Sequence, residues 1–180
     1  MKTTLYQFII ILCMIIVLLF LGRVAWCACG SLNPFSLDPN SMHNSQHFLD
    51  LYSLSHFLHG ILFFAILYFL PVSSSTKLIL ATLLEASWEV LENSPFIINR
   101  YRTVTIALNY YGDSILNSCG DVFSCLVGFW FAKKYSTLVC IVTFIGIELF
   151  LLWYMRDNLT LNILMLTFPS EAVKAWQSQI

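Results

Sequence analysis

Charged residues are scarce in this sequence: Asp, Glu, Lys and Arg together make up 11% of its 180 residues. A soluble globular domain carries about 25%, so this composition excludes a surface that water wets on all sides. The formal net charge is −1, and the missing basic excess argues against a nucleic-acid partner. The chain has instead 58% hydrophobic residues and a mean hydropathy of +0.77. We therefore predict an all-α, polytopic membrane helix bundle formed by one domain, residues 1–180.

Zinc-binding cysteine patterns and serine nucleophile motifs are absent as well. Four of the six cysteines lie in apolar segments and are expected to be small core residues: Cys13, Cys119, Cys125 and Cys140. Cys27 and Cys29, in "WCACG", follow the first apolar segment. These two alone do not predict a structural zinc site. With a second thiol pair they could complete a metal site or meet an oxidant, and packing is the role we expect.

Five apolar segments are long enough to cross a bilayer, which takes roughly 17–25 residues. We predict spans at about 5–24, 53–70, 77–93, 113–132 and 136–154. The first has an apolar core too long for a signal peptide and no A-x-A site, so we read it as an uncleaved span. The connections 27–52 and 94–112 are longer. The tail 158–180 is expected to form a short interfacial helix with Trp176 as an anchor.

The orientation is inferred from the two short loops, which carry Lys77, Lys133 and Lys134 and no acidic residue. A raw count of basic residues on the two sides is close to a tie. The lysine-only loops favour a cytoplasmic N-terminus. The opposite ends of the spans then face the periplasm, and Arg100 and Arg102 are treated there as site residues rather than free loop charges.

Polar residues gather on that second side. Alternating spans bring together the start of the second, the end of the third and the start of the fourth. At about 100° per residue, each segment keeps its polar residues on one helix face. They are His56 and His59 on the second span, Glu85, Glu89 and Glu92 on the third, and Asp113, Asn117 and Asp121 on the fourth, with Arg100, Tyr101 and Arg102 in the preceding loop.

Energetics indicate that these groups share one polar site. A charge at mid-span costs about 2.5–3.5 kcal/mol on insertion scales. Five carboxylates against two arginines leave an excess of three negative charges, so either some carboxylates are protonated or a cation is bound. Oxygen ligands with one or two imidazoles suit one divalent ion such as Mg²⁺, Mn²⁺ or Zn²⁺. The predicted metal ligands are His59, Glu89, Asp113 and Asp121.

The remaining roles follow from the same pattern. General acid–base or metal-assisted catalysis is assigned to His56, His59, Glu85, Glu89, Asp113 and Asp121. Binding of an anionic head group is assigned to Arg100, Arg102, Asn117 and Tyr101. Simpler roles stay open: Glu92 and Asp113 could be solvated at the interface, and the arginines could bind lipid phosphates or neutralise the glutamates. His56 could be a core residue, and Asn117 could only bond neighbouring helices.

The chain resembles a family of small uncharacterised multi-pass inner-membrane proteins of proteobacteria. The resemblance rests on "CACG", "NSQH", "DLYSLSHFLHG", "EASWEVLENSPFIINRYRTVTIALNYYGDSILNSCGD" and "RDNLTLNILMLTFPSEAVKAWQ", most of the chain after the first span. It implies a location in the bacterial inner membrane and no assigned activity. At Asn109 the family pattern has an acidic residue, which puts Asn109 in doubt as a metal ligand. A remoter likeness is to VanZ-like membrane proteins, which implies envelope or glycopeptide-linked physiology.

Three functions are compatible with these residues, and they leave open whether the chain is an enzyme. The first is a metal-dependent hydrolase or transferase that acts on a lipid-linked anionic substrate near the periplasmic leaflet. The second is an ion- or proton-coupled transporter, for which Glu148 in the fifth span is the one further carboxylate. The third is a non-enzymatic accessory or small-molecule-binding protein. Membrane lipid is the expected partner, and the oligomeric state is not predicted.

Overall fold

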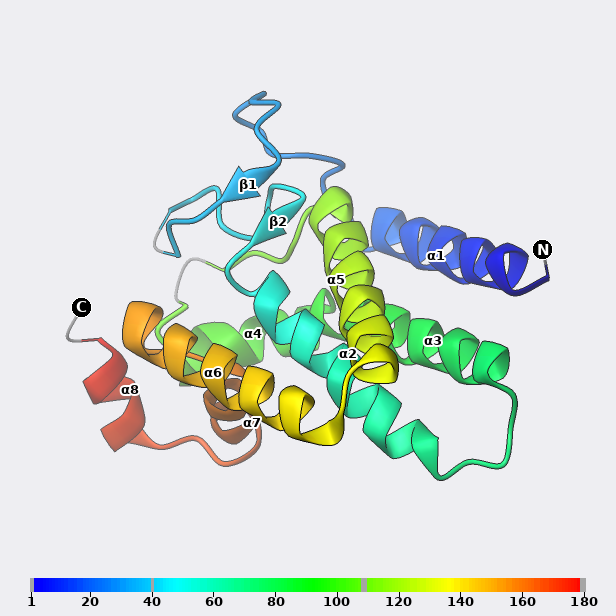
Figure 1. Ribbon diagram of the computed structural model, residues 1–180. Coiled ribbons are helices and arrows are strands. Elements are labelled where there is room, and N and C mark those ends of the chain that lie inside the picture. The colour runs from blue at the N-terminus through cyan, green and yellow to red at the C-terminus, as the bar shows by residue number, and fades with distance from the viewer. Residues whose placement is uncertain (1, 40, 108–109, 179–180) are drawn as a thin grey trace.

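The computed structural model describes residues 2–39, 41–107 and 110–178, and these residues form eight helices and one small sheet (Figure 1). The predicted all-helical class is correct, with a pair of short strands added to it. The strands pair in parallel, with Phe35 opposite Leu49. The helices are α1 Lys2–Phe20, α2 Ser53–Tyr68, α3 Ser74–Glu92, α4 Pro95–Val104, α5 Ile115–Lys134, α6 Thr137–Met155, α7 Leu159–Thr167 and α8 Glu171–Gln177, and the strands are β1 Phe35–Ser36 and β2 Leu49–Asp50.

Serine side chains set the starts of four helices. Each accepts a hydrogen bond from a backbone N–H of the first turn, which satisfies a donor that has no partner inside the helix. At α4 this cap, Ser94, is followed by Pro95 at the first helical position, a combination that favours helix initiation. The predicted connection 94–112 therefore contains a helix that was not expected. The four caps are Ser73 for α3, Ser94 for α4, Ser114 for α5 and Ser136 for α6.

Three of the described helices are long and apolar enough to cross a membrane: α1, α5 and α6. The predicted count of about five is not confirmed. Helix α2 is apolar but has 16 residues, about 24 Å at 1.5 Å per residue, less than the roughly 30 Å of a hydrocarbon core. Helix α3 has 19 residues, but Lys77 and three glutamates lower its hydropathy.

Helices α2 and α5 cross at close range because glycines lie at their contact (Figure 1). A Cβ atom on Gly60 of α2 would overlap the carbonyl oxygen of Cys125 on α5. A Cβ atom on Gly128 of α5 would overlap the carbonyl oxygen of Phe57 on α2. Small residues of this kind let two helix backbones approach each other. The contact fixes the distance between the polar residues of the two helices.

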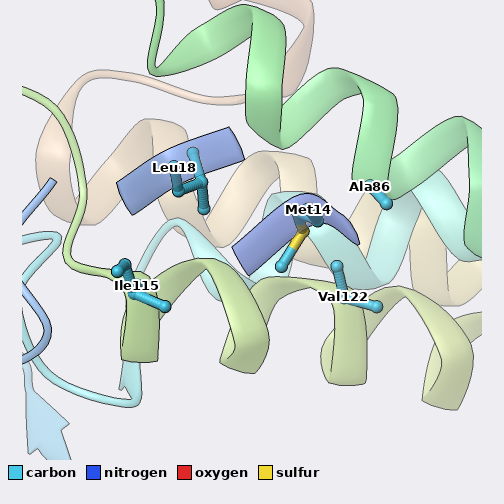
Figure 2. Packing of buried hydrophobic residues seen from close by; sticks show 5 residues of the cluster. All are labelled: Met14, Leu18, Ala86, Ile115 and Val122. Atoms are coloured by element: carbon cyan, nitrogen blue, oxygen red, sulfur yellow. The ribbon is translucent and has the colours of Figure 1, made fainter. Parts of the chain in front are cut away.

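Helix α1 packs against α3 and α5 through one face. Met14 and Leu18 are buried against Ala86 of α3 and against Ile115 and Val122 of α5 (Figure 2). The rest of α1 is largely exposed, and this corrects one prediction, because Cys13 lies on the exposed face rather than in the core.

The C-terminal helices close the fold beside α6. Arg156 ends α6 in the left-handed conformation, with φ of 50°, and donates a hydrogen bond from Nη1 to the carbonyl oxygen of Trp176. Asp157 follows it and accepts hydrogen bonds from Tyr52 Oη, Asn162 Nδ2 and Gln177 Nε2. The tail expected to form one interfacial helix thus consists of α7 and α8, and both are tied to the bundle.

Candidate functional site

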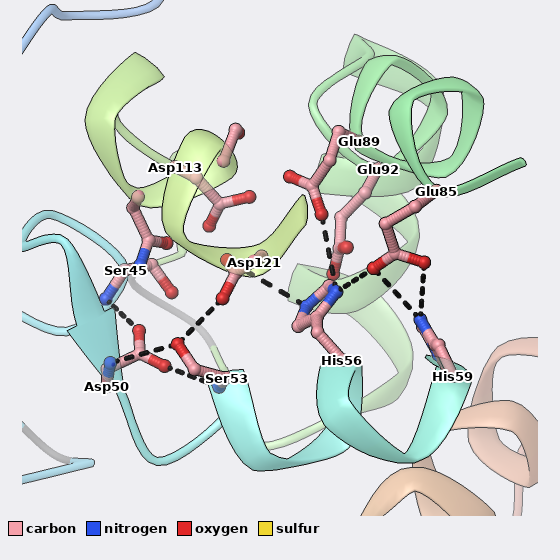
Figure 3. A network of polar contacts seen from close by, with 12 residues as sticks. Ser45, Asp50, Ser53, His56, His59, Glu85, Glu89, Glu92, Asp113 and Asp121 are labelled. Carbon is pink, nitrogen blue, oxygen red and sulfur yellow. Dashed lines mark hydrogen bonds and ion pairs between the residues drawn. The ribbon is translucent and has the colours of Figure 1, made fainter. Parts of the chain in front are cut away.

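The site is built around His56, in the first turns of α2, which faces carboxylates on two other helices (Figure 3). Its Nδ1 atom lies 2.5 Å from Glu85 Oε1 and 3.3 Å from Glu89 Oε1, both on α3. Its Nε2 atom lies 3.9 Å from Asp121 Oδ2 on α5. A single imidazole thus connects three carboxylates from two helices.

His59 adds a second imidazole one turn further along α2. Its Nδ1 atom lies 3.1 Å from Glu85 Oε2, so Glu85 contacts both histidines. The ring packs edge-on against the indole of Trp88 and lies near the ring of Phe63. We call the residues that meet here the His56 cluster: His56, His59, Glu85, Glu89, Glu92 and Asp121.

Four of the six residues of the His56 cluster are buried, and His59 and Glu92 are half-buried. Glu85 and Glu89 are 0% exposed and His56 is 7% exposed. Neither carboxylate oxygen of Glu89 has a hydrogen-bond partner, and neither does Glu92 Oε2. An ionised carboxylate in a medium of low dielectric constant is strongly destabilised unless it is paired and hydrogen-bonded. Both imidazoles together, if protonated, carry two positive charges against the four carboxylates of the cluster. The cluster therefore has fewer positive charges than carboxylates, and three of its carboxylate oxygens accept no hydrogen bond.

A chain of hydrogen bonds extends from the His56 cluster to the loop before α2. Ser53 donates from Oγ to Asp121 Oδ1 at 2.7 Å. Asp50 accepts hydrogen bonds from the backbone N–H groups of Ser53 and Ser45. Figure 3 shows these residues beside the histidines. Burial raises the pKa of Asp50, and the two backbone donors oppose that rise.

Asp113 lies just before α5, and its hydrogen-bond partners are Asn93 and Tyr110. It accepts hydrogen bonds from Asn93 Nδ2 at 2.8 Å and from Tyr110 Oη, and its backbone N–H donates to Asn93 Oδ1. Burial raises its pKa, and the hydrogen bonds from Asn93 and Tyr110 oppose the shift. The predicted span began at residue 113, but α5 begins at Ile115 after its Ser114 cap, so Asp113 belongs to the connection.

Of the four predicted substrate-binding residues, Tyr101 contacts the His56 cluster, and Asn117, Arg100 and Arg102 contact other parts of the chain. Tyr101 of α4 donates from Oη to Glu92 Oε1 at 3.0 Å, which joins α4 to the His56 cluster. Asn117 donates from Nδ2 to the carbonyl oxygen of His47. Arg100 donates from Nε to the carbonyl oxygen of Leu166 at the end of α7, and the Arg102 guanidinium lies over the Tyr111 ring at 4.8 Å.

Groups of side-chain donors that could hold a metal ion occur in two places in the described parts of the chain. Two of them share His56: one joins it to His59 and Glu85, and the other joins it to Glu89 and Glu92. The donor atoms of each group lie within 4.8 Å of one another. Of the predicted ligands, His59 and Glu89 belong to these groups, whereas Asp121 contacts His56 and Asp113 faces Asn93. Asn109 lies outside the described residues.

The third group of candidate metal ligands was not predicted from the sequence. It consists of Cys27 and Cys29 after α1 and of His43 and His47 before β2. The available signal was a Cys-x-Cys pair followed by a His-x-x-x-His pair. The cysteine spacing is one residue shorter than the usual C-x₂₋₄-C pattern, and the histidines lie in a long loop with no predicted element.

Glu148 of α6 contacts the first residues of α7 through its carboxylate. It accepts hydrogen bonds from the backbone N–H groups of Leu159 and Thr160, at 3.0 and 3.1 Å, and from the Thr160 hydroxyl. A carboxylate at the start of a helix is stabilised by the free N–H groups and the helix dipole. Glu148 thus caps α7.

A mostly apolar groove of about 280 Å³ runs beside the loop end of the hydrogen-bond chain. Asp50 and Ser53 are its polar lining residues together with Ser124. The apolar lining comes from the sheet and the residues that follow its strands, from α2 and from α5, and consists of Phe35, Leu37, Leu49, Leu51, Leu54, Phe57, Phe123 and Val127. The groove brings an apolar surface next to Ser53, which contacts Asp121 of the His56 cluster.

Comparison with known proteins identifies relatives in several proteobacteria. A UPF0314 protein of Sinorhizobium fredii is 48% identical over 160 residues, which cover 88% of this chain and 81% of the relative. One of Novosphingobium aromaticivorans is 48% identical over 173 residues, 92% of this chain and 87% of the relative. One of Paracoccus denitrificans is 42% identical over 175 residues, which cover 96% of this chain and 91% of the relative. No solved structure matches the chain.

The sequence profile of the family described as "Protein of unknown function (DUF2585)" matches residues 18–179. This range contains every residue of the His56 cluster and also Cys27, Cys29, His43 and His47. The likeness to VanZ-like proteins has no counterpart among these relatives and stays a prediction. The predicted membership in an uncharacterised proteobacterial family is confirmed, and the chain belongs to the DUF2585 family, together with the UPF0314 proteins.

Proposed function

We propose that this chain is a multi-pass protein of the bacterial inner membrane that binds one divalent metal ion at the His56 cluster and hydrolyses, or transfers a group from, a lipid-linked anionic substrate. The observation that carries the proposal is the buried carboxylate of Glu89, which is 0% exposed and has no hydrogen-bond partner for either oxygen. A cation among Glu89, Glu85 and the two imidazoles would supply the missing positive charge.

The donor types of the cluster fit a divalent ion. Imidazole nitrogen suits Zn²⁺ and carboxylate oxygen suits Mg²⁺ and Mn²⁺, and Zn²⁺ accepts both. A bound ion of this kind would polarise a phosphoryl oxygen or lower the pKa of a bound water molecule. Glu92 and Tyr101 would orient groups next to it, since the Tyr101 hydroxyl donates to Glu92 Oε1.

Two features support an amphipathic substrate. Arg100 and Arg102 lie on α4, the helix that Tyr101 joins to the cluster, where Arg100 Nε contacts Leu166 and Arg102 stacks on Tyr111. Their guanidinium N–H groups would bind a phosphate through charge-assisted hydrogen bonds. The apolar groove beside Asp50 and Ser53 suits a hydrocarbon chain. A phosphate attached to a long isoprenoid chain has both parts.

The proposed orientation keeps the N-terminus in the cytoplasm and the cluster near the periplasmic leaflet. The apolar helices α1, α5 and α6 support a membrane location. Lys77 in the first turn of α3, and Lys133 and Lys134 in the last turn of α5, lie next to short connections and support the orientation. The cap that Glu148 forms on α7 gives this carboxylate a structural role, which supports placing the transporter second.

The experiment uses the full chain in detergent micelles, loaded with Mg²⁺, Mn²⁺ or Zn²⁺, and a polyprenyl diphosphate as the probe. Hydrolysis would break a P–O bond and release inorganic phosphate, with water as the acceptor. We expect release that a chelator abolishes, that Glu89→Gln lowers at least about 100-fold, and that Arg102→Gln weakens through KM. The surface variant Glu171→Gln is the control. Metal-independent release, or equal rates in wild type and Glu89→Gln, would contradict the proposal.

A further inference from the structure

We infer that Cys27, Cys29, His43 and His47 form a structural zinc site, separate from the His56 cluster. The donor atoms of these four side chains lie within 4.8 Å of one another. They come from two stretches of one loop region, the turn after α1 and the segment before β2. We call them the Cys/His cluster.

The distances inside the Cys/His cluster match a tetrahedral ion. Cys27 Sγ lies 3.2 Å from His43 Nδ1, and Cys29 Sγ lies 3.8 Å from His47 Nε2. A tetrahedral Zn²⁺ with Zn–S of about 2.3 Å and Zn–N of about 2.0–2.1 Å places sulfur and nitrogen about 3.5 Å apart. The observed pairs lie on either side of this value.

The surroundings of His47 fix which ring nitrogen is available. Its Nδ1 atom is within hydrogen-bond distance of the carbonyl oxygen of Asn33, and a carbonyl oxygen only accepts, so Nδ1 carries the proton. In the neutral ring Nε2 is then the nitrogen with a free lone pair, and it faces Cys29 Sγ. Histidines that bind metals donate their other N–H in this way to a carbonyl or carboxylate. His47 is 4% exposed, so this arrangement is held by packing as well.

The cysteine turn has the same organisation. Gly30 adopts φ of +69°, a conformation that favours glycine, and donates from its backbone N–H to the carbonyl oxygen of Cys27 at 3.2 Å. The backbone N–H of Ser31 donates to Cys29 Sγ at 3.4 Å. The turn thus folds back on itself and places both sulfur atoms on the histidines' side.

Four protein ligands leave no coordination position for substrate, which is the property of structural zinc sites. The ion would join the end of α1 to the histidine segment. That segment is anchored elsewhere: Ser45 donates its backbone N–H to Asp50 Oδ2, and Asn117 donates to the carbonyl oxygen of His47. The zinc site would therefore hold the loop that positions Asp50 and, through Ser53, Asp121.

The test uses purified full-length chain in detergent, with Zn²⁺ content measured by mass spectrometry. A second sample is loaded with Co²⁺, which reports tetrahedral geometry by its visible bands and thiolate ligands by a charge-transfer band in the near ultraviolet. We expect both Co²⁺ signals in wild type and in Cys13→Ser, the cysteine control. We expect their loss in Cys27→Ser and in His47→Ala.

A second measurement avoids variants that fail to fold. In the wild-type chain, Cys27 and Cys29 should resist alkylation until a chelator removes the metal, and should then react at least about tenfold faster, because a thiolate bound to zinc is not free to act as a nucleophile. Equal alkylation with and without chelator would overturn the inference. So would a Cys27–Cys29 disulfide in freshly purified protein, or Co²⁺ bound without the thiolate band.

The two proposed metal sites can be tested separately, because each has a variant that should leave the other site unchanged. Glu89→Gln should leave the thiolate–Co²⁺ band unchanged, and Cys27→Ser should leave the ion of the His56 cluster in place. Loss of the thiolate band in Glu89→Gln while the chain remains folded would contradict the separation.

Discussion

His56 and Glu85 form the shortest ion pair among the described residues, with Nδ1 2.5 Å from Oε1, and both side chains are buried. Glu85 also contacts His59 Nδ1 at 3.1 Å. One carboxylate therefore holds two imidazoles of α2 against α3. This relationship ties the geometry of the polar site to the stability of the fold.

Replacing Glu85 by glutamine should destabilise the chain strongly. Removing one partner of a buried ion pair costs about 3–5 kcal/mol, because the other charge is left uncompensated. We expect a lower free energy of unfolding and a lower Tm in detergent for Glu85→Gln. Glu171→Gln, which changes an exposed glutamate at the start of α8, should shift Tm little. An unchanged Tm in Glu85→Gln would mean that the pair is not formed.

Asp157 should make stability depend on pH in a predictable direction. Burial raises its pKa from 3.8 to about 6, although Tyr52 and Asn162 donate hydrogen bonds to it. The folded state therefore binds the proton more tightly than the unfolded state. Its stabilising contribution is complete below about pH 4 and is lost as the pH rises through about 6, by about 3 kcal/mol.

The measurement compares unfolding of wild type and Asp157→Asn between pH 4 and 7. Asparagine has no proton to lose, so the variant should lack this part of the decline, and the difference between the two chains isolates Asp157 from the other buried acids. A difference that stays constant with pH, or that grows in the opposite direction, would contradict the raised pKa.

The α2–α5 crossing should not tolerate a side chain at Gly60. The Cβ of Gly60→Val would overlap the carbonyl oxygen of Cys125, and overpacking of this kind costs about 1–3 kcal/mol or more. Gly146→Val on α6 is the matched control, since a Cβ at Gly146 meets nothing within 4 Å. Thermal unfolding should separate the two variants by several degrees. Equal Tm values would show that the helices can move apart at no cost.

Filling the apolar groove should reduce lipid binding. Val127 lines it from α5, and Val127→Trp adds bulk where we place the hydrocarbon chain. Labelling by a photoactivatable isoprenoid phosphate should fall at least about fivefold, whereas Val142→Trp on an exposed part of α6 should label like wild type. Equal labelling of the two variants would contradict the proposal that the groove binds the hydrocarbon chain.

The gathering of polar residues was predictable from sequence because it follows from the alternation of apolar segments. His56 in the first turns of α2, Glu85 and Glu89 in the second half of α3 and Asp121 in the first half of α5 meet in the His56 cluster. Their roles stay predictions. The short length of α2 and the separate helix α4 were not foreseen, because the segment around Pro95 was read as a connection although Ser94 and Pro95 signal a helix start.

The contacts of residues outside the predicted spans were the least predictable. Arg100 and Arg102 are predicted to bind an anionic head group, with neutralisation of the glutamates as the alternative. In the structure Arg100 contacts Leu166 of α7 and Arg102 stacks on Tyr111. His43 and His47 were overlooked because their proximity to Cys27 and Cys29 depends on how a loop returns across the end of α1. Helical periodicity says nothing about such returns.

The most direct test of the account is the divalent-metal content of the His56 cluster. Wild type, Glu89→Gln and Glu171→Gln are purified in detergent, loaded with each ion in turn, desalted and analysed by mass spectrometry, with the thiolate–Co²⁺ band as a separate count of the Cys/His cluster. We predict that Glu89→Gln retains about one ion fewer per chain than wild type and Glu171→Gln with an unchanged thiolate band. Equal metal content in all three folded chains would contradict the account.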